Sequence, residues 1–210
     1  MEKKTSTKII NTLVNHYGEV KADLNFSNVY QLAVAVVLSA QTTDKQVNGV
    51  TGQLFSRYPD FKTLAAARLE DVRQIIKSTG FYRNKASNII SMAGMVAKEF
   101  NGILPAEREQ LVRLPGVGRK SANVILSVGY GHPALAVDTH VIRISNRLGY
   151  ISSKNPLEIE KALCSFIPEN KWNAAHLLFI RHGRNICKAR NPLCGDCPIE
   201  SFCDSPDKTV

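Results

Sequence analysis

The stretch LVRLPGVGRKSANVIL, from Leu111 to Leu126, constrains the fold more than any other part of the chain. An apolar turn leads into Pro115, whose ring fixes one φ angle, and glycines follow at Gly116 and Gly118. The helical spacing of apolar residues resumes after Arg119. The pattern predicts two helices joined by a tight glycine turn.

This glycine turn offers a binding surface as well as a chain reversal. The first N–H groups of the second helix have no partners within that helix, and the helix dipole is positive at that end. Such a turn binds a backbone phosphate without reading sequence. An ordinary tight turn between core helices is the alternative, which LPGVG alone leaves open. The candidate contact residues are Leu114, Pro115, Gly116, Val117, Gly118 and Arg119.

Lys120 occupies an unfavourable place for a merely structural lysine. It lies in the first turn of the predicted second helix, where the positive end of the dipole disfavours a cation. The same field favours an uncharged amine, which is the form that attacks carbon. The sequence therefore makes Lys120 a candidate nucleophile.

Asp138 is the only acidic residue between Gln110 and Leu157, a region that otherwise carries basic residues. A lone carboxylate opposes phosphate binding there unless it serves another purpose. One purpose is structural, because Asp138 precedes Thr139 and an apolar helical pattern and is therefore predicted to cap a helix. Capping and catalysis are compatible, so Asp138 is a candidate for both.

The chain as a whole is basic. Its 210 residues carry a formal net charge of +9, with a pI near 9.4, which suits a polyanionic partner. Charge alone fits a merely basic protein equally well. No apolar run is long enough to span a bilayer, and the N-terminal segment MEKKTSTKIIN lacks a secretory apolar core. The expected location is the cytoplasm.

Four of the five cysteines form the pattern C-x6-C-x2-C-x5-C, at Cys187, Cys194, Cys197 and Cys203. A cytoplasmic chain rarely forms disulfides, so the pattern indicates a metal site. Four thiolates suit zinc or an iron–sulfur cluster. The unequal spacing fits a cluster somewhat better, but spacing alone leaves both open.

A basic segment overlaps this cysteine pattern. Between Asn170 and Cys194 there are five basic residues and no acid. Two of them, Lys188 and Arg190, lie in the loop between the first two cysteines. We expect a second phosphate-binding surface, held in shape by the metal. A solvated loop whose charges have no partner is the alternative.

Helical spacing of apolar residues recurs along the chain and predicts an all-α fold of about ten helices. Val29–Leu38 is apolar on nearly every face, which is typical of a helix buried in the middle of a domain. Glycines or prolines close most of the predicted helices, and no internal repeat or long linker interrupts them.

Taken together, LPGVGRKSANVIL, AVDTHVIRISNRLG and the cysteine pattern resemble the endonuclease III family of helix-hairpin-helix DNA glycosylases. LSAQTTDKQVN at 38–48 and TGFYRNKASNII at 79–90 extend the resemblance over nearly the whole chain. It implies two helical lobes with DNA between them. One is a six-helix barrel with the helix-hairpin-helix motif, at 22–133. The other combines 1–21 with 134–210 and carries a [4Fe–4S] cluster on the four cysteines.

The resemblance also implies the chemistry. The family excises oxidised pyrimidines such as thymine glycol in base excision repair and cuts the abasic strand by β-elimination. Lys120 matches its nucleophilic lysine, which forms a Schiff base, and Asp138 matches its essential aspartate. Gln41 matches a residue that fills the gap left by the flipped base, Phe81 stands where the family commonly has a leucine wedge, and His140 joins the expected DNA contacts. The implied partner is double-stranded DNA with damaged bases or abasic sites, bound by a monomer at the nucleoid.

Two alternatives remain at this point. Mismatch-specific and adenine-removing glycosylases of the same fold lack the lysine, and the latter usually add a C-terminal domain that we do not expect after this cysteine pattern. A non-enzymatic helix-hairpin-helix DNA-binding protein would need the hairpin but not Lys120 together with Asp138.

Overall fold

The computed structural model describes residues 1–209, and within that range it is helical and contains no strand. The all-α prediction is confirmed. None of the helices in this range combines the length and the apolar character that crossing a bilayer requires.

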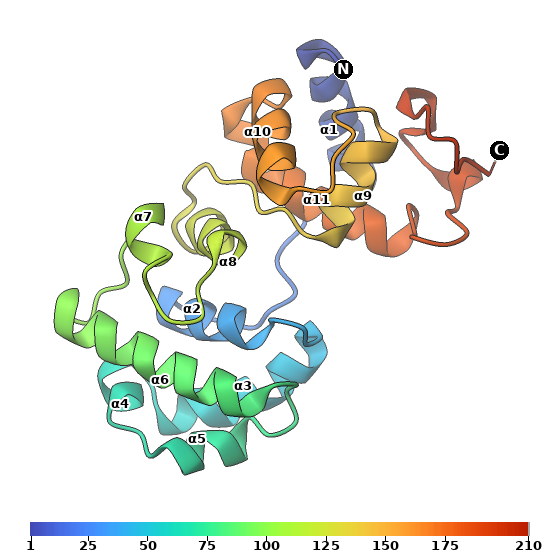
Figure 1. Ribbon diagram of the computed structural model, residues 1–210. Coiled ribbons are helices and arrows are strands. Elements are labelled where there is room, and N and C mark those ends of the chain that lie inside the picture. The colour runs from blue at the N-terminus through green and yellow to red at the C-terminus, as the bar shows by residue number, and fades with distance from the viewer. Residues whose placement is uncertain (210) are drawn as a thin grey trace. The chain divides into compact units, whose positions relative to one another are not determined.

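The chain divides into two compact units (Figure 1). The continuous unit is Asp23–Gly131, and the discontinuous unit combines Met1–Ala22 with the chain from His132 onward. The first and last parts of the sequence therefore fold together, while the middle forms a unit of its own.

The continuous unit is arranged around α2 (Val29–Leu38), which is buried along almost its whole length. Asn28 caps this helix by accepting a hydrogen bond from the Gln31 N–H, and neighbouring helices pack on several of its faces. This explains why its sequence is apolar all round. The other elements are α3 (Asp44–Arg57), α4 (Phe61–Ala65), α5 (Leu69–Ile75), α6 (Tyr82–Glu99), α7 (Arg108–Leu111), α8 (Arg119–Val124) and the π-helical turn η1 (Ile125–Gly129).

The π-helical turn is a departure from the regular helix that spacing predicts after Arg119. It ends at Gly129, where an added Cβ would lie 2.9 Å from Leu32 Cδ2 of α2. The wider turn therefore accompanies a close approach to α2, where any larger residue would force the Leu32 side chain to shift. Such π-turns inside helices occur frequently at functional sites.

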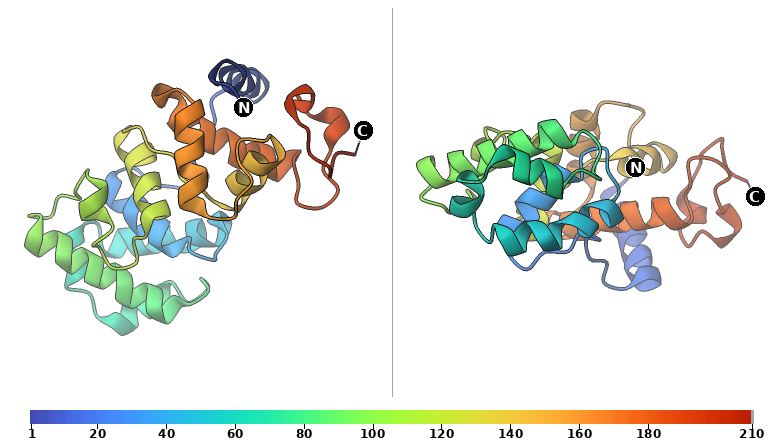
Figure 2. Two further views of the ribbon diagram at one scale, coloured as in Figure 1. Left: turned by 45° about the horizontal axis from the view of Figure 1, so that its top comes forward. Right: turned by 90° about the horizontal axis from the view of Figure 1, so that it is seen from below.

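The discontinuous unit joins the N-terminal helix to the C-terminal helices (Figure 2). Ile9, Ile10 and Leu13 of α1 share one core with Leu163 and Phe179. Tyr150 belongs to the same core, and its Oη forms a buried hydrogen bond of 2.8 Å with Ser6 Oγ of α1, far away in sequence. The elements are α1 (Lys3–Tyr17), α9 (Thr139–Arg147), α10 (Pro156–Phe166), α11 (Trp172–Asn185) and the 3-10 turns η2 (Glu169–Lys171), η3 (Cys194–Asp196) and η4 (Glu200–Phe202).

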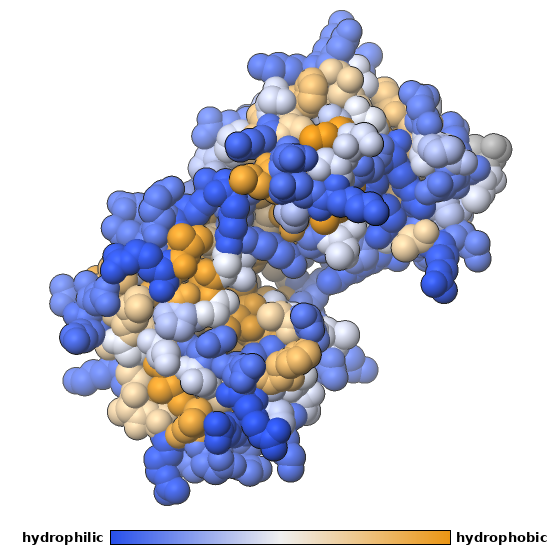
Figure 3. All heavy atoms as spheres, in the orientation of Figure 1, coloured by the Kyte–Doolittle hydropathy of each residue, from blue (hydrophilic) through white to orange (hydrophobic). Residues whose placement is uncertain are grey.

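The surface in Figure 3 is largely hydrophilic, with hydrophobic residues in small separate groups. Among the large hydrophobic side chains that are exposed, Phe81 is the only aromatic one in the described chain, with 66% of its surface in solvent. This exposure leaves the Phe81 ring accessible to a binding partner.

Candidate active site and metal centre

The glycine turn between α7 and α8 depends on Gly116. Its φ angle is +81°, and an added Cβ would lie 2.9 Å from Val37 Cγ1 and 3.1 Å from Asn88 Cβ. Backbone conformation and close packing therefore both require glycine there. Gly118 differs, because its φ is −89° and a Cβ on it would meet nothing within 4 Å.

The residues of this hairpin divide into an inner and an outer set. Leu114 and Val117 are buried and anchor the turn in the continuous unit. The outer set, which faces solvent, consists of Gly116, Gly118, Arg119 and Lys120. Lys120 is the second residue of α8, and no side chain caps that helix. Two cations and a helix N-terminus thus share one exposed surface, which suits a phosphate.

Gln41 and Phe81 also lie in the continuous unit, in two turns that touch. Both side chains are exposed, and both backbones are left-handed, with φ angles of 53° and 55°. A Cβ added to Gly80 would lie 3.6 Å from Gln41 O, which shows how close the turns are. Left-handed backbone is strained for residues of these types and tends to occur at functional positions.

The helices that carry these turns also border the hairpin. α2 ends shortly before Gln41, and α6 begins directly after Phe81. Val37 of α2 and Asn88 of α6 are the residues packed against Gly116. Seven residues of helix span only ~10 Å, so the hairpin and the paired turns occupy neighbouring parts of one unit.

Asp138 lies in the discontinuous unit and caps α9, as predicted. Its Oδ1 accepts hydrogen bonds from the N–H groups of His140, at 2.8 Å, and Val141, at 2.9 Å. Both bonds use the same carboxylate oxygen. Capping therefore uses one of the two oxygens of the Asp138 carboxylate, and this side chain is only partly buried.

His140 is held as a neutral imidazole. Its Nδ1 lies 3.1 Å from Arg143 Nη2, and since a guanidinium can only donate, Nδ1 is the acceptor. Burial lowers the pKa of His140, the carboxylate of Asp138 opposes that change, and the charge of Arg143 adds to it. His140 can thus offer a binding partner a hydrogen bond but not a charge.

The four predicted metal ligands, Cys187, Cys194, Cys197 and Cys203, line one pocket, and none is in a disulfide. Burial and then the charges of the other three thiols raise the pKa of Cys197 to about 11, against a hydrogen bond from the Ile199 N–H. Metal binding must therefore displace a proton there. Within residues 1–209 no three His, Cys, Asp or Glu side chains are arranged around a single ion. The donor set, four thiols around a pocket, fits an iron–sulfur cluster.

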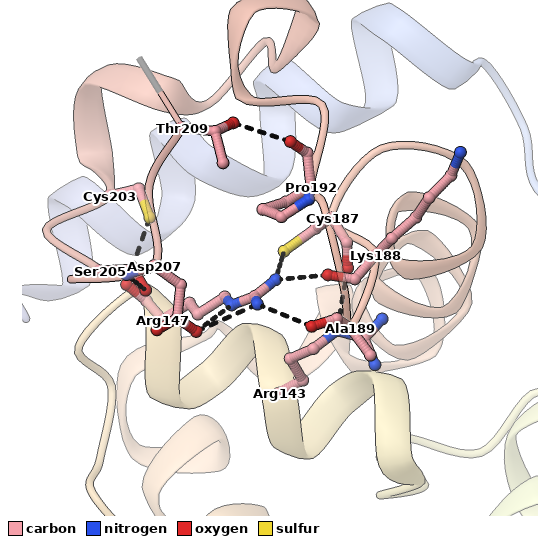
Figure 4. Close-up of polar contacts among 10 residues, drawn as sticks. All are labelled: Arg143, Arg147, Cys187, Lys188, Ala189, Pro192, Cys203, Ser205, Asp207 and Thr209. Carbon is pink, nitrogen blue, oxygen red and sulfur yellow. Dashed lines mark hydrogen bonds and ion pairs between the residues drawn. The ribbon is translucent and has the colours of Figure 1, made fainter.

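Two arginines of α9 tie this pocket to the basic loop (Figure 4). Arg147 Nη1 donates to Cys187 Sγ at 3.3 Å and to the Lys188 carbonyl at 2.7 Å, and Nη2 donates to Asp207 Oδ2 at 3.1 Å. Arg143 Nε donates to the Cys187 carbonyl at 2.9 Å. These arginines thus fix the loop backbone, while the side chains of Lys188 and Arg190 are exposed.

The sequence interpretation assigned neither arginine a role, although their spacing of four residues places them on one helix face. Nor does the sequence assign a role to His182. The structure brings His182 Nδ1 within 3.0 Å of Tyr17 Oη and Nε2 within 3.5 Å of Cys197 Sγ. Burial, followed by the charges of His16 and Arg143, lowers the pKa of His182 to about 4, so it is a neutral neighbour of the thiol.

The predicted site residues therefore fall into two groups. The continuous unit holds Gln41, Phe81, the hairpin residues 114–119 and Lys120, and the discontinuous unit holds Asp138, His140, the four cysteines, Lys188 and Arg190.

Comparison with known proteins defines the class. Residues 34–169 match the HhH-GPD superfamily of base excision DNA repair proteins, and residues 187–203 match the iron-sulfur binding domain of endonuclease III. The second match begins and ends on the first and last of the four cysteines. The chain is thus a helix-hairpin-helix base excision repair protein with a [4Fe–4S] cofactor, and the open choice between zinc and iron–sulfur is decided for iron–sulfur.

Individual relatives show which family within this superfamily the chain resembles. Endonuclease III of Bacillus subtilis (strain 168) is 46% identical over 91% of this chain and 88% of its own length. That of Synechocystis sp. (strain ATCC 27184 / PCC 6803 / Kazusa) is 43% identical over 97% and 94%. The solved structure of a trapped endonuclease III–DNA covalent intermediate, an estranged-adenine complex, superposes with a TM-score of 0.91 at 42% identity, covering 97% of this chain and 96% of that one.

The chain belongs to the endonuclease III family. It is accordingly a DNA-binding, bifunctional DNA glycosylase and AP lyase of base excision repair, which confirms the resemblance and excludes the non-enzymatic alternative.

The cysteine pocket leads to a prediction about the purified protein. It should be yellow-brown and contain iron and acid-labile sulfide, because four thiolates around one pocket are the ligands of such a cluster. Visible absorption and iron and sulfide assays measure this. Cys197→Ser should lose colour and iron, whereas Cys164→Ser, at a half-buried cysteine outside the pocket, should keep both. One zinc atom per chain without a chromophore would contradict the assignment.

Proposed function

We propose that the chain excises oxidised pyrimidines such as thymine glycol from double-stranded DNA and cuts the resulting abasic strand through a Schiff base on Lys120. The observation that carries the proposal is the position of Lys120, exposed at the start of the helix that follows the glycine hairpin. A relative 42% identical forms a covalent intermediate with DNA, which requires a nucleophile on the protein. Lys120 supplies a nucleophile of this kind beside a phosphate-binding turn.

The proposed reaction begins with extrusion of the damaged base, because a side chain cannot reach the sugar carbon inside a stacked duplex. The uncharged amine of Lys120 attacks C1′, the bond from C1′ to the base breaks, and the base leaves with a proton. The sugar ring opens at O4′ as the imine forms. Loss of a C2′ proton then breaks the C3′–O bond, and the 3′ phosphate leaves.

Asp138 provides the charge that this reaction needs. Both capping bonds use Oδ1 of Asp138. We therefore assign the catalytic role to the other carboxylate oxygen, Oδ2. A carboxylate helps to activate the lysine amine and stabilises the cationic character that develops on the sugar. The [4Fe–4S] cluster would be held by the four cysteines and would shape the basic loop, without taking part in bond breaking.

DNA contacts complete the proposal. The hairpin residues Leu114 to Arg119 hold one phosphate, Lys188 and Arg190 hold others, and His140 contributes a neutral hydrogen bond. Gln41 and Phe81 enter the duplex where the base leaves. All these residues occur on one chain, so we propose a monomer on damaged or abasic double-stranded DNA, associated with the nucleoid through that binding.

A panel of duplexes tests the proposal. Thymine-glycol DNA should release its base and be cut, and abasic DNA should be cut without base release, because Lys120 serves both steps. A duplex with a G·T mismatch should be processed far more slowly. Preferential excision from the mismatch would instead assign the chain to the mismatch-specific glycosylases of this fold.

The basic loop leads to a prediction about salt. Binding of the wild type to undamaged duplex should weaken steeply with salt, since each neutralised phosphate releases counterions. In Lys188→Glu/Arg190→Glu the slope of log affinity against log salt should fall by about one unit for each lost contact. His140→Gln is the matched control and should keep the wild-type slope, because His140 is neutral. An unchanged slope in the double variant would mean that other basic residues make the phosphate contacts.

A further inference from the structure

We propose that Lys85 is a positioning residue that fixes the turns of Gln41 and Phe81 to each other, so that both enter the duplex as one rigid unit. The inference rests on the proposed function, in which these two side chains replace the extruded base. Lys85 itself does not contact DNA in this proposal.

The geometry behind the proposal is a pair of bonds from one residue to two turns. Lys85 Nζ donates to Thr42 Oγ1 at 2.5 Å, and the Lys85 backbone N–H donates to the Phe81 carbonyl at 3.1 Å. Thr42 follows Gln41 directly, and its hydroxyl donates in turn to the Ala40 carbonyl at 3.4 Å. The residues on both sides of Gln41 are therefore linked through Thr42 to the first turn of α6.

Packing alone does not explain why a lysine occupies position 85. Only 4% of its surface is exposed, and burial lowers the pKa of its amine. Lys85 lies on the helix face that also presents Ile89, Met92 and Val96 to the core, so an apolar side chain would suit the position. Burying a cation beside a neutral hydroxyl costs free energy that an apolar residue of the same length avoids. The amine must therefore contribute something other than stability.

What it contributes is restraint of strained backbone. Gln41 and Phe81 both have left-handed φ angles, a conformation that non-glycine residues keep only where their surroundings hold it. A bond from Lys85 to each turn supplies such surroundings. With Lys85 Nζ removed, the Gln41 turn is free to relax while Phe81 stays fixed at the start of α6. Insertion into DNA then has to order the turn again.

Lys85→Met tests the inference, because methionine keeps the length and apolar stem but removes the donor. The melting temperature should be unchanged or higher. Excision from thymine-glycol duplex should fall roughly 10–100-fold, the size expected of a small misplacement. Borohydride trapping on a single-stranded abasic oligonucleotide, which needs no extrusion, should be unchanged. The fluorescence rise of 2-aminopurine placed opposite an abasic-site analogue in duplex DNA should be smaller.

Variants of Thr42, which accepts the hydrogen bond from Lys85, test the inference further. Thr42→Val should reproduce the loss, Thr42→Ser should restore wild-type rates, and the double variant Lys85→Met/Thr42→Val should be no slower than either single one. Lys98→Met, at an exposed lysine of the same helix, is the matched control. A lower melting temperature with equal losses on single and double strands would make Lys85 merely structural and overturn the inference.

Phe81→Ala distinguishes a failure of the proposed function from a failure of the inference about Lys85. If Phe81→Ala extrudes bases normally, the proposed wedge role fails, and the inference fails with it. If Phe81→Ala is slow but Lys85→Met extrudes normally, the proposed function stands and the inference alone is overturned.

Discussion

Replacing Lys120 with alanine is expected to abolish covalent trapping on DNA. Wild-type protein incubated with a thymine-glycol duplex and borohydride should form a stable adduct, because borohydride reduces the imine to an amine. Lys120→Ala lacks the amine that forms the imine. The side chain is exposed near a helix N-terminus, so its loss should change the free energy of unfolding by no more than ~0.5 kcal/mol. Gel electrophoresis of the trapped complex and thermal melting measure the two effects.

Lys120→Arg is the control that separates charge from nucleophilicity. Arginine keeps a cation beside the hairpin but stays protonated, so it cannot attack carbon. It should bind duplex DNA as the wild type does and still fail to trap. Trapping of Lys120→Ala at the wild-type rate would mean that another amine of the chain is the nucleophile.

Replacing Asp138 with asparagine is expected to slow the reaction by roughly 10²–10³-fold, the usual cost of losing one preorganised electrostatic contact. Asparagine caps helices about as well as aspartate, and its side-chain oxygen can still accept from the N–H groups of His140 and Val141. The melting temperature should stay near normal. DNA binding should be retained or tighter, because a negative charge is removed from a basic region.

Asp138→Ala separates capping from charge. It removes both and should add a loss of stability of ~1 kcal/mol to the loss of rate. Single-turnover excision together with thermal melting distinguishes the two variants. If Asp138→Asn melts normally and cleaves thymine-glycol DNA within a few-fold of the wild type, Asp138 is only a cap.

Local signals were sufficient to predict most of the fold. Asn28 and Asp138 cap helices through their own side chains, and Asn155 does so just before the proline that begins α10. The π-turn that ends at Gly129 could not be predicted, because it accompanies a contact with Leu32, nearly a hundred residues earlier. Spacing reports which face of a helix is buried, but not where a neighbour requires the helix to widen.

The candidate site was predictable to the extent that residue type reveals role. Gly116 follows from the need for a left-handed turn, whereas the same backbone at Gln41 and Phe81 has no signal in their residue types. Lys85 and Arg147 carry charges that the structure pairs with Thr42 and with Cys187, far away in sequence. For Lys85, the available signal was a charged residue on the apolar face of α6, but its partner is visible only in three dimensions.

The division into a continuous and a discontinuous unit affects how the chain folds while it is being synthesised. The ribosome makes α1 before α11, yet the apolar side chains Ile9, Ile10 and Leu13 share a core with Phe179 of α11. At ~5–20 residues per second, the nascent helix waits many seconds for its partners, while Asp23–Gly131 can already fold. During that interval the apolar face of α1 has no core to pack against. Truncation before α11 is therefore expected to expose the apolar side chains of α1.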